Sequence, residues 1–284
     1  MPGRAKHRRG LAAVAAVALA LTGCAAADAA DGLPPGVAVE LTQLRSDVAE
    51  RRMQVRVQND TDAVIEVVGV TVADRRFAEP ARRVIDRPTS IAPGRTVALP
   101  VQLAQAACAA PAAVDVTVTL TYRLDDALRT TTVAAREGFP FLADLHAREC
   151  LAASVAASAA LSLGPFAASP PGEPAVLPLE VAPRAGGAAV RLVAIRETNL
   201  LSYRQRDAAA TAYPLDRRVG ATAESIALPI VPARCDPHAV QEDKRGTVFT
   251  LDVEVDGHAG TIQLAASPEL RADILTWVTA WCRG

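Results

Sequence analysis

The stretch Ala98-Leu99-Pro100-Val101 recurs toward the other end of the chain as Ala227-Leu228-Pro229-Ile230, and a cysteine follows each copy. A motif that repeats together with its downstream neighbours indicates an internal duplication. The segments upstream of the two copies fall into the same register. Residues 57–68 and 181–193 each read as a strand, a polar turn and a second strand. The sequence therefore predicts two halves built on one plan.

A predicted hairpin follows the first cysteine of each half. In both hairpins apolar residues alternate with polar ones, which is the period of a half-buried strand. The turn between the strands is Asp125-Asp126 in the first half and Asp256-Gly257 in the second, and Asp-Gly is a strong signal for a type I′ turn. The alternating apolar residues are Val114, Val116, Val118, Leu120 and Tyr122, and then Phe249, Leu251, Val253 and Val255.

Each half is predicted to close with a partly helical segment that ends at its second cysteine. In the second half Ser267 can cap a helix that has Pro268 at its first position. Trp277 and Trp281 fall on the apolar face of that helix and are expected in the core. The first half has a looser version, with Phe139, Phe141, Leu142 and Leu145 before Cys150.

These patterns predict an all-β fold of two tandem immunoglobulin-like β-sandwich domains with short C-terminal helical segments. The second half is expected to start with a strand over residues 155–163, where apolar residues alternate with small or polar ones. The boundary then falls near Leu151. Domain 1 is expected over residues 37–151 and domain 2 over residues 152–284, with almost no linker between them.

Four cysteines, Cys108, Cys150, Cys235 and Cys282, form an even set in a chain that carries an export signal, and disulfides persist outside the cytoplasm. Of the three possible connectivities, the duplication favours Cys108 with Cys150 and Cys235 with Cys282. Free thiols or a metal site are the alternative. The wide spacings and the lack of a C-x-x-C motif weigh against it.

The N-terminus has the features of an export signal over residues 1–23. Basic residues precede an apolar run over residues 11–21, which is too short to span a bilayer because a span needs roughly 20 residues. The run ends in Leu21-Thr22-Gly23-Cys24, which resembles a bacterial lipobox. That resemblance implies acylation, such as palmitoylation, of Cys24 as the first residue of the mature chain. Residues 24–36, rich in Ala, Asp, Gly and Pro, then read as a flexible tether.

The charge of the mature chain argues against a nucleic-acid partner. Removing residues 1–23 takes away four of the 30 Lys and Arg residues and none of the 31 Asp and Glu residues, which leaves a net charge of −5. Aromatic residues make up only 4% of the chain. Nucleic-acid binding requires a basic surface, usually with aromatic side chains for stacking.

The lipobox, the bias toward Arg and Ala, and one further segment together resemble uncharacterised exported lipoproteins of actinobacteria. That segment is Arg234-Cys235-Asp236-Pro237-His238, continuing to Glu242-Asp243-Lys244-Arg245-Gly246. The resemblance implies a lipid-anchored protein on the outer face of the cytoplasmic membrane. It implies no activity.

Residues 236–245 occur in the second half alone, and insertions on a repeated scaffold often carry function. Asp236, His238, Glu242 and Asp243 could form a binding loop or hold a metal, although a solvated charged loop is the simpler interpretation because no defined ligand spacing is present. The chain lacks G-x-S-x-G, H-E-x-x-H and Gly-rich phosphate motifs. No catalytic residue, metal or cofactor is therefore predicted.

The remaining candidates have structural interpretations. His146 is expected beside the core and His258 on the surface. Two sets of arginines could bind anions, although interleaved acids favour ion pairing or edge-strand protection. The predicted function is a lipid-anchored envelope binding or spacer module whose partners are the membrane and another envelope protein or a wall polymer. The alternative is a metal-binding or hydrolytic lipoprotein that uses residues 236–245. The arginines are Arg75, Arg76, Arg82, Arg83, Arg204, Arg206, Arg217 and Arg218.

Overall fold

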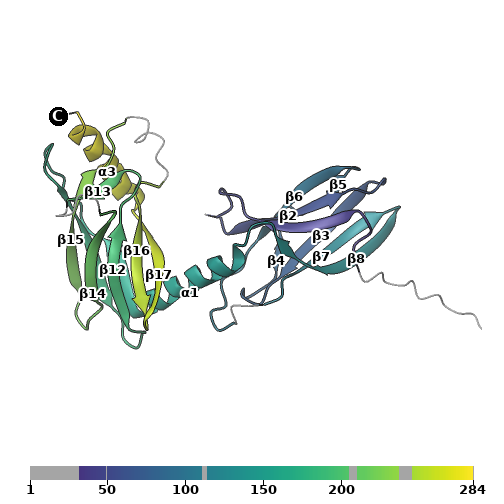
Figure 1. Ribbon diagram of the computed structural model, residues 1–284, viewed down its shortest axis with the longest axis horizontal. Coiled ribbons are helices and arrows are strands. Elements are labelled where there is room, and N and C mark those ends of the chain that lie inside the picture. The colour runs from purple at the N-terminus through teal and green to yellow at the C-terminus, as the bar shows by residue number, and fades with distance from the viewer. Residues whose placement is uncertain (1–31, 49, 111–113, 205–209, 237–244, 284) are drawn as a thin grey trace, which may run out of the picture.

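The computed structural model describes residues 32–48, 50–110, 114–204, 210–236 and 245–283 (Figure 1). Strands dominate, and two helices accompany them within these residues. The elements are β1 Val37–Thr42, β2 Arg52–Asn59, β3 Ile65–Ala73, β4 Ala81–Arg83, β5 Thr89–Ile91, β6 Arg95–Gln102, β7 Thr117–Leu124, β8 Ala127–Ala134, β9 Arg136–Glu137, α1 Leu142–Ser158, β10 Ala159–Leu163, β11 Ala175–Pro183, β12 Val190–Arg196, β13 Leu201–Tyr203, β14 Ala212–Arg218, β15 Glu224–Pro232, β16 Val248–Val255, β17 His258–Ala265 and α3 Pro268–Trp281.

The first domain folds β1 to β9 around one apolar core. One layer has the order β8-β7-β3, with β5 also paired to β3, and the other has the order β6-β2-β1-β9. The short strand β4 pairs with both β3 and β6, so it joins the two layers into one continuous sheet. Alternate residues of β7 point into the core, because Val118, Leu120 and Tyr122 are buried while the threonines between them are half-buried.

The second domain is a sandwich of two separate four-stranded sheets. Their strand orders are β10-β11-β15-β13 and β14-β12-β16-β17. Leu177, Leu228 and Phe249 are fully buried between the sheets. Burying a side chain of this size contributes roughly 1.5–3 kcal/mol relative to leaving it exposed. The predicted all-β fold with two sandwich domains is therefore confirmed.

The strand pairings also confirm the duplication. The repeated Ala-Leu-Pro motifs lie in β6 and β15, which pair with β2 and β11 respectively. The hairpins β7–β8 and β16–β17 are likewise equivalent. In both turns the central residues have positive φ, with values of 50° and 59° at Asp125 and Asp126. This geometry is that of a type I′ turn, whose twist matches the flanking strands.

The segment between the domains differs from the prediction of a strand over residues 155–163. Helix α1 runs unbroken to Ser158, and the first strand of the second domain, β10, begins at Ala159. The predicted boundary near Leu151 thus lies inside a helix. Four of the six residues from Ala152 to Ala157 are alanine, the best helix former. Small apolar residues fit the periods of both strand and helix, which explains why alternation gave the wrong prediction.

The closing helix of the second domain, α3, begins as predicted. The Ser267 side chain accepts a hydrogen bond from the backbone N–H of Leu270 at 3.1 Å, and Pro268 follows at the first helical position. Trp277 is buried, as expected, whereas Trp281 is only partly buried at the core's edge. Within the described ranges, neither helix combines the length and the apolar character that crossing a membrane requires.

Candidate functional site

The principal feature outside the two cores is the joint at which α1 passes from the first domain into the second (Figure 1). A cavity of about 640 Å³ lies at this joint. One wall is formed by α1 and the Cys108–Cys150 disulfide, and the other by the hairpin of β16 and β17. The lining residues are Cys108, Asp144, Ala147, Arg148, Cys150, Leu151, Ser154, Val255, Asp256, His258, Ala259, Gly260 and Thr261.

The N-terminal half of α1 is attached to the first domain. The residue at its N-cap position, Phe141, provides no side-chain cap. Glu137 takes over this role, because its Oε2 accepts hydrogen bonds from the N–H groups of Phe141 at 2.6 Å and Leu142 at 3.0 Å. A carboxylate also suits the positive end of the helix dipole. Leu142 and Leu145 then pack into the first core.

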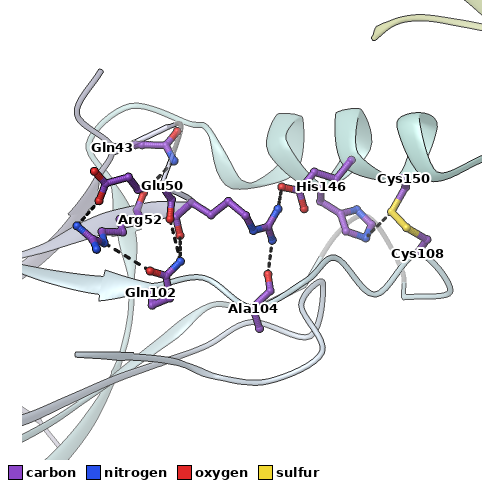
Figure 2. Close-up of polar contacts among 10 residues, drawn as sticks. Gln43, Glu50, Arg52, Gln102, Ala104, Cys108, His146 and Cys150 are labelled. Carbon is purple, nitrogen blue, oxygen red and sulfur yellow. Dashed lines mark hydrogen bonds and ion pairs between the residues drawn. A yellow bond between two sulfur atoms is a disulfide. The ribbon is translucent and has the colours of Figure 1, made fainter. Parts of the chain in front are cut away.

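The Cys108–Cys150 disulfide and His146 hold the middle of α1 (Figure 2). His146 points from the helix toward the disulfide, with its Nε2 3.5 Å from the Cys150 sulfur and 3.2 Å from the Ala107 carbonyl oxygen. Its ring also meets Phe77 edge to face. His146 is buried, so the prediction that it lies beside the core is confirmed.

A second tie to the first domain is the ion pair between Arg51 and Glu149. The Arg51 guanidinium also donates to the Ala104 carbonyl oxygen. Desolvation by burial lowers the pKa of Arg51 from its ordinary value, but an arginine stays protonated in a protein. Arg51 has a φ of 54°, an uncommon conformation for a residue with a side chain. This turn directs its side chain to the helix.

The C-terminal half of α1 is attached to the second domain. Arg184 donates from its backbone N–H to the Ser158 carbonyl oxygen at 2.7 Å and from its guanidinium to the Ala156 carbonyl oxygen at 2.6 Å. These bonds satisfy the free carbonyls at the end of the helix. Val155 packs into the second core. One helix is therefore shared by both domains.

Two close approaches bring α1 against the second domain. A Cβ atom added at Gly260, in β17, would lie 2.5 Å from Cδ2 of Leu151. A Cβ atom at Gly187 would lie 2.4 Å from Cα of Ser158. Real Cβ atoms do not approach other atoms so closely, so a larger residue at either position would push the helix or its side chains away.

The side chains at the joint are suited to holding the two domains together. Its charged groups carry mixed signs, with Asp144, Arg148 and Asp256 facing one cavity, and Asp256 already accepts a hydrogen bond from the N–H of Ala189. Across the ranges with described structure, no group of three or more His, Cys, Asp or Glu residues is placed to hold a metal ion.

The predicted site residues have different outcomes. Both predicted disulfides are present, and each spans a Cα–Cα distance of 5.3 Å. His258 is exposed, as expected, at the start of β17. Cys24 lies outside the described residues. So do His238, Glu242 and Asp243 of the predicted binding loop, of which only Asp236 and Arg245 are described.

Three arginines of the two predicted clusters have structural partners of their own. Arg76 is buried and pairs with Asp74 at 2.8 Å. Arg83 donates to the Val67 carbonyl oxygen and to Thr89, and Arg204 donates to the Gly172 carbonyl oxygen. Arg217 and Arg218 lie on the edge strand β14. Arg206 is outside the described residues.

The sequence did not predict the joint itself. Arg51 and Glu149 are far apart in the chain, and nothing local marks either as a partner of the other. The only local signal was the Ala-rich composition after Cys150, which favours a helix that continues past the cysteine.

Comparisons with known proteins give similarities of fold only. No family model matches the chain, and no curated protein matches it either. Among solved structures it is similar to the YadV chaperone (14% identity, TM-score 0.23, covering 81% of this chain and 100% of the other) and to the CupB2 chaperone of Pseudomonas aeruginosa (12%, 0.20, 78% and 95%). It is also similar to the E. coli chaperone DraB (13%, 0.22, 81% and 98%). Similarities this distant carry no argument about what the chain binds.

Proposed function

We propose that this chain is a lipid-anchored module of the cell envelope that holds its second domain at a fixed position relative to the first. In this role acylated Cys24 attaches the protein to the outer face of the cytoplasmic membrane, and residues 24–36 form the tether. The second domain then presents a binding surface to another envelope protein or a wall polymer, or acts as a spacer.

The observation that carries the proposal is the sharing of α1 by both cores. Leu145 packs into the first core and Val155 into the second. They are ten positions apart along the helix, a distance of roughly 15 Å. The disulfide and Arg51 fix one half of the helix, and Arg184 fixes the other. A chain joined by a free linker would need none of these contacts.

The anchor is tested by labelling cells with an alkyne-bearing palmitate and fractionating them. The wild-type chain should carry the label and sediment with membranes, whereas Cys24→Ser should carry no label. Equal labelling of both would refute Cys24 as the lipid site. Label on neither would refute the lipid anchor.

The fixed arrangement is tested by electron spin resonance between labels at Ala98→Cys and Ala227→Cys, which are exposed and equivalent positions of the two repeats. The background is the mature chain with Cys24→Ser. We expect one narrow distance distribution. Adding Ala153→Pro in the exposed middle of α1 should broaden it, since proline breaks a helix interior, while the control Ala153→Ser should not. A broad distribution in the unmodified background would refute the rigid joint.

Binding is separated from spacing by a pull-down from solubilised envelope with the same Cys24→Ser chain as bait. If the second domain presents a binding surface, the pull-down should recover one protein or polymer. The Ala153→Pro chain should recover the same partner, because this substitution changes the joint and not the binding surface. If the chain is a spacer, recovery should match the empty resin. Neither outcome affects the results of the tests of the lipid anchor and of the rigid joint.

A further inference from the structure

The strand β8 is a long sheet edge, and the residues that the structure describes do not cover or interrupt it. It has eight residues, Ala127–Ala134, with no proline and with Arg129 as its only charged residue. Its register with β7 is continuous, so it contains no bulge. Leu128 on this strand is 58% exposed. Exposed edges of this kind are templates for pairing with another chain, and natural proteins normally disrupt them.

The other sheet edges in the described parts of the chain are disrupted in the usual ways. Strands β5, β9 and β13 have three residues or fewer. Strand β14 contains Pro214 and three charged residues, and its register with β12 shifts at a bulge. Strand β10 is short, with five residues, and continues directly from α1, and strand β17 packs against α1. Strand β17 is the equivalent of β8. The two copies of this strand therefore differ, because β17 packs against α1 and β8 has no such cover among the described residues.

The hairpin turn decides which backbone groups of β8 face outward. Asp125 and Asp126 form a two-residue type I′ turn, and the residues on either side of such a turn exchange hydrogen bonds with each other. Hydrogen-bonded pairs alternate along an antiparallel ladder. The N–H and C=O groups of four residues therefore point away from β7, toward the open edge. These residues are Leu128, Thr130, Thr132 and Ala134.

We propose that the open edge of β8 pairs antiparallel with β8 of a second copy of this chain, about a twofold axis at Thr131. In this register Thr130 lies opposite Thr132 of the second copy, and Leu128 lies opposite Ala134. The outward-facing backbone groups of both copies then meet each other and form a continuous ladder.

The side chains of β8 suit this register. Within the hairpin, Thr119 pairs with Thr132 at 2.8 Å and Thr121 with Thr130 at 3.2 Å through their hydroxyl oxygens. Pairing Thr130 with Thr132 across the axis extends both threonine rows into the second copy. The single charged residue, Arg129, lies opposite Val133, so no like charges face each other. Cross-strand threonine pairs are favourable, whereas facing like charges are unfavourable.

Antiparallel pairing places the starts of the two β1 strands at opposite ends of the joined sheet, because β1 begins beside the β7–β8 turn end of the domain. Each tether must therefore run back along its domain if both copies share one membrane. Residues 24–36 reach at most about 45 Å, and an eight-residue strand spans roughly 26 Å. The tether is long enough.

The test is sedimentation equilibrium of the mature chain with Cys24→Ser, compared with two variants that differ only in charge sign. We expect a monomer–dimer equilibrium in the unmodified chain. Thr130→Lys/Thr132→Lys places two pairs of like charges across the axis and should weaken the dimer roughly tenfold. Thr130→Lys/Thr132→Glu places opposite charges in the same pairs and should retain it.

The two variants control for each other. Both remove the same hydroxyl contacts from the hairpin, so thermal unfolding followed by circular dichroism should be similar for both. The two lysines also bring the net charge of −5 closer to zero, so overall repulsion cannot explain a weaker dimer. A monomer at all concentrations would overturn the proposal. So would a dimer that both variants weaken equally, since that result would exclude this register.

Discussion

The two domains share one pairing plan and differ in the helix that comes after their final hairpin. In the second domain α3 ends at Trp281, next to Cys282, and serves that domain alone. In the first domain α1 continues eight residues past Cys150 and becomes part of the second domain. The duplicated core is thus retained, while the closing helix of the first copy has become the joint.

The different courses of the two helices also leave the sheet edges of the two domains in different surroundings. Helix α1 packs against β17 of the second domain, and the equivalent β8 of the first domain lacks such a cover in the described structure. Helix α1 lies between the two copies and packs against β17 of the second copy, so equivalent strands meet different surroundings. The two copies can differ in role through these different surroundings, although their cores share one plan.

The largest expected effect comes from removing each disulfide in turn. Closing loops of 42 and 47 residues stabilises each domain by about 4 kcal/mol in the chain-entropy model. Both tryptophans of the chain lie in α3, so tryptophan fluorescence reports on the second domain. In urea unfolding, Cys235→Ser/Cys282→Ser should lower the midpoint of this signal far more than Cys108→Ser/Cys150→Ser. Equal shifts would mean that α1 makes the two domains unfold as one unit.

A matched pair of core truncations tests the same comparison with a smaller effect. Leu120 in β7 and Leu251 in β16 occupy equivalent, fully buried positions. Replacing either with alanine should lower the free energy of unfolding by about 2–5 kcal/mol. Only Leu251→Ala should shift the fluorescence midpoint, whereas both should shift the circular dichroism signal. A fluorescence shift from Leu120→Ala would again indicate coupled domains.

Removing the capping residue should destabilise the N-termini of both helices by a similar free energy, although different residues cap them. Ser267→Ala removes the cap of α3, and Glu137→Ala removes the two hydrogen bonds that begin α1. Each should cost about 1 kcal/mol. Hydrogen exchange at the amides of Leu270 and Leu142 measures this directly. Unchanged protection of Leu142 in Glu137→Ala would show that the disulfide alone holds the start of α1.

The smallest expected effect concerns an exposed ion pair that belongs to the second domain. Hydrogen bonds from Arg191 hold the pKa of Asp216 below its usual value, so the folded state favours the ionised carboxylate. The stabilisation is therefore present above the ordinary Asp pKa and is lost as the pH falls through the lowered one. The melting temperature of Asp216→Asn should lie slightly below that of the wild type at neutral pH, and the difference should vanish in acid. A difference that persists there would point to packing instead.

Much of the fold could be predicted because its signals are local. The alternation in β7 and β16, the Asp-Gly turn and the Ser267-Pro268 start each concern neighbouring residues, and the two disulfides follow from the repeat. The joint could not be predicted in the same way. Arg51 meets Glu149, and Leu151 meets Gly260, only after both domains have folded. Residues 155–158, predicted as the start of a strand, belong to α1, because small apolar residues and serine are compatible with either period.

The shared helix also sets an order of events as the chain emerges with its N-terminus first. The first domain has all its strands, and the cysteine partner for Cys108, once residue 150 is free. The last turns of α1 have their complete packing surface only after β17 and Gly260 have emerged. During that interval the helix end is exposed, and short isolated helices are unstable in water. We therefore expect the first domain to fold before the second, and the end of α1 to become stable only when the second domain is complete.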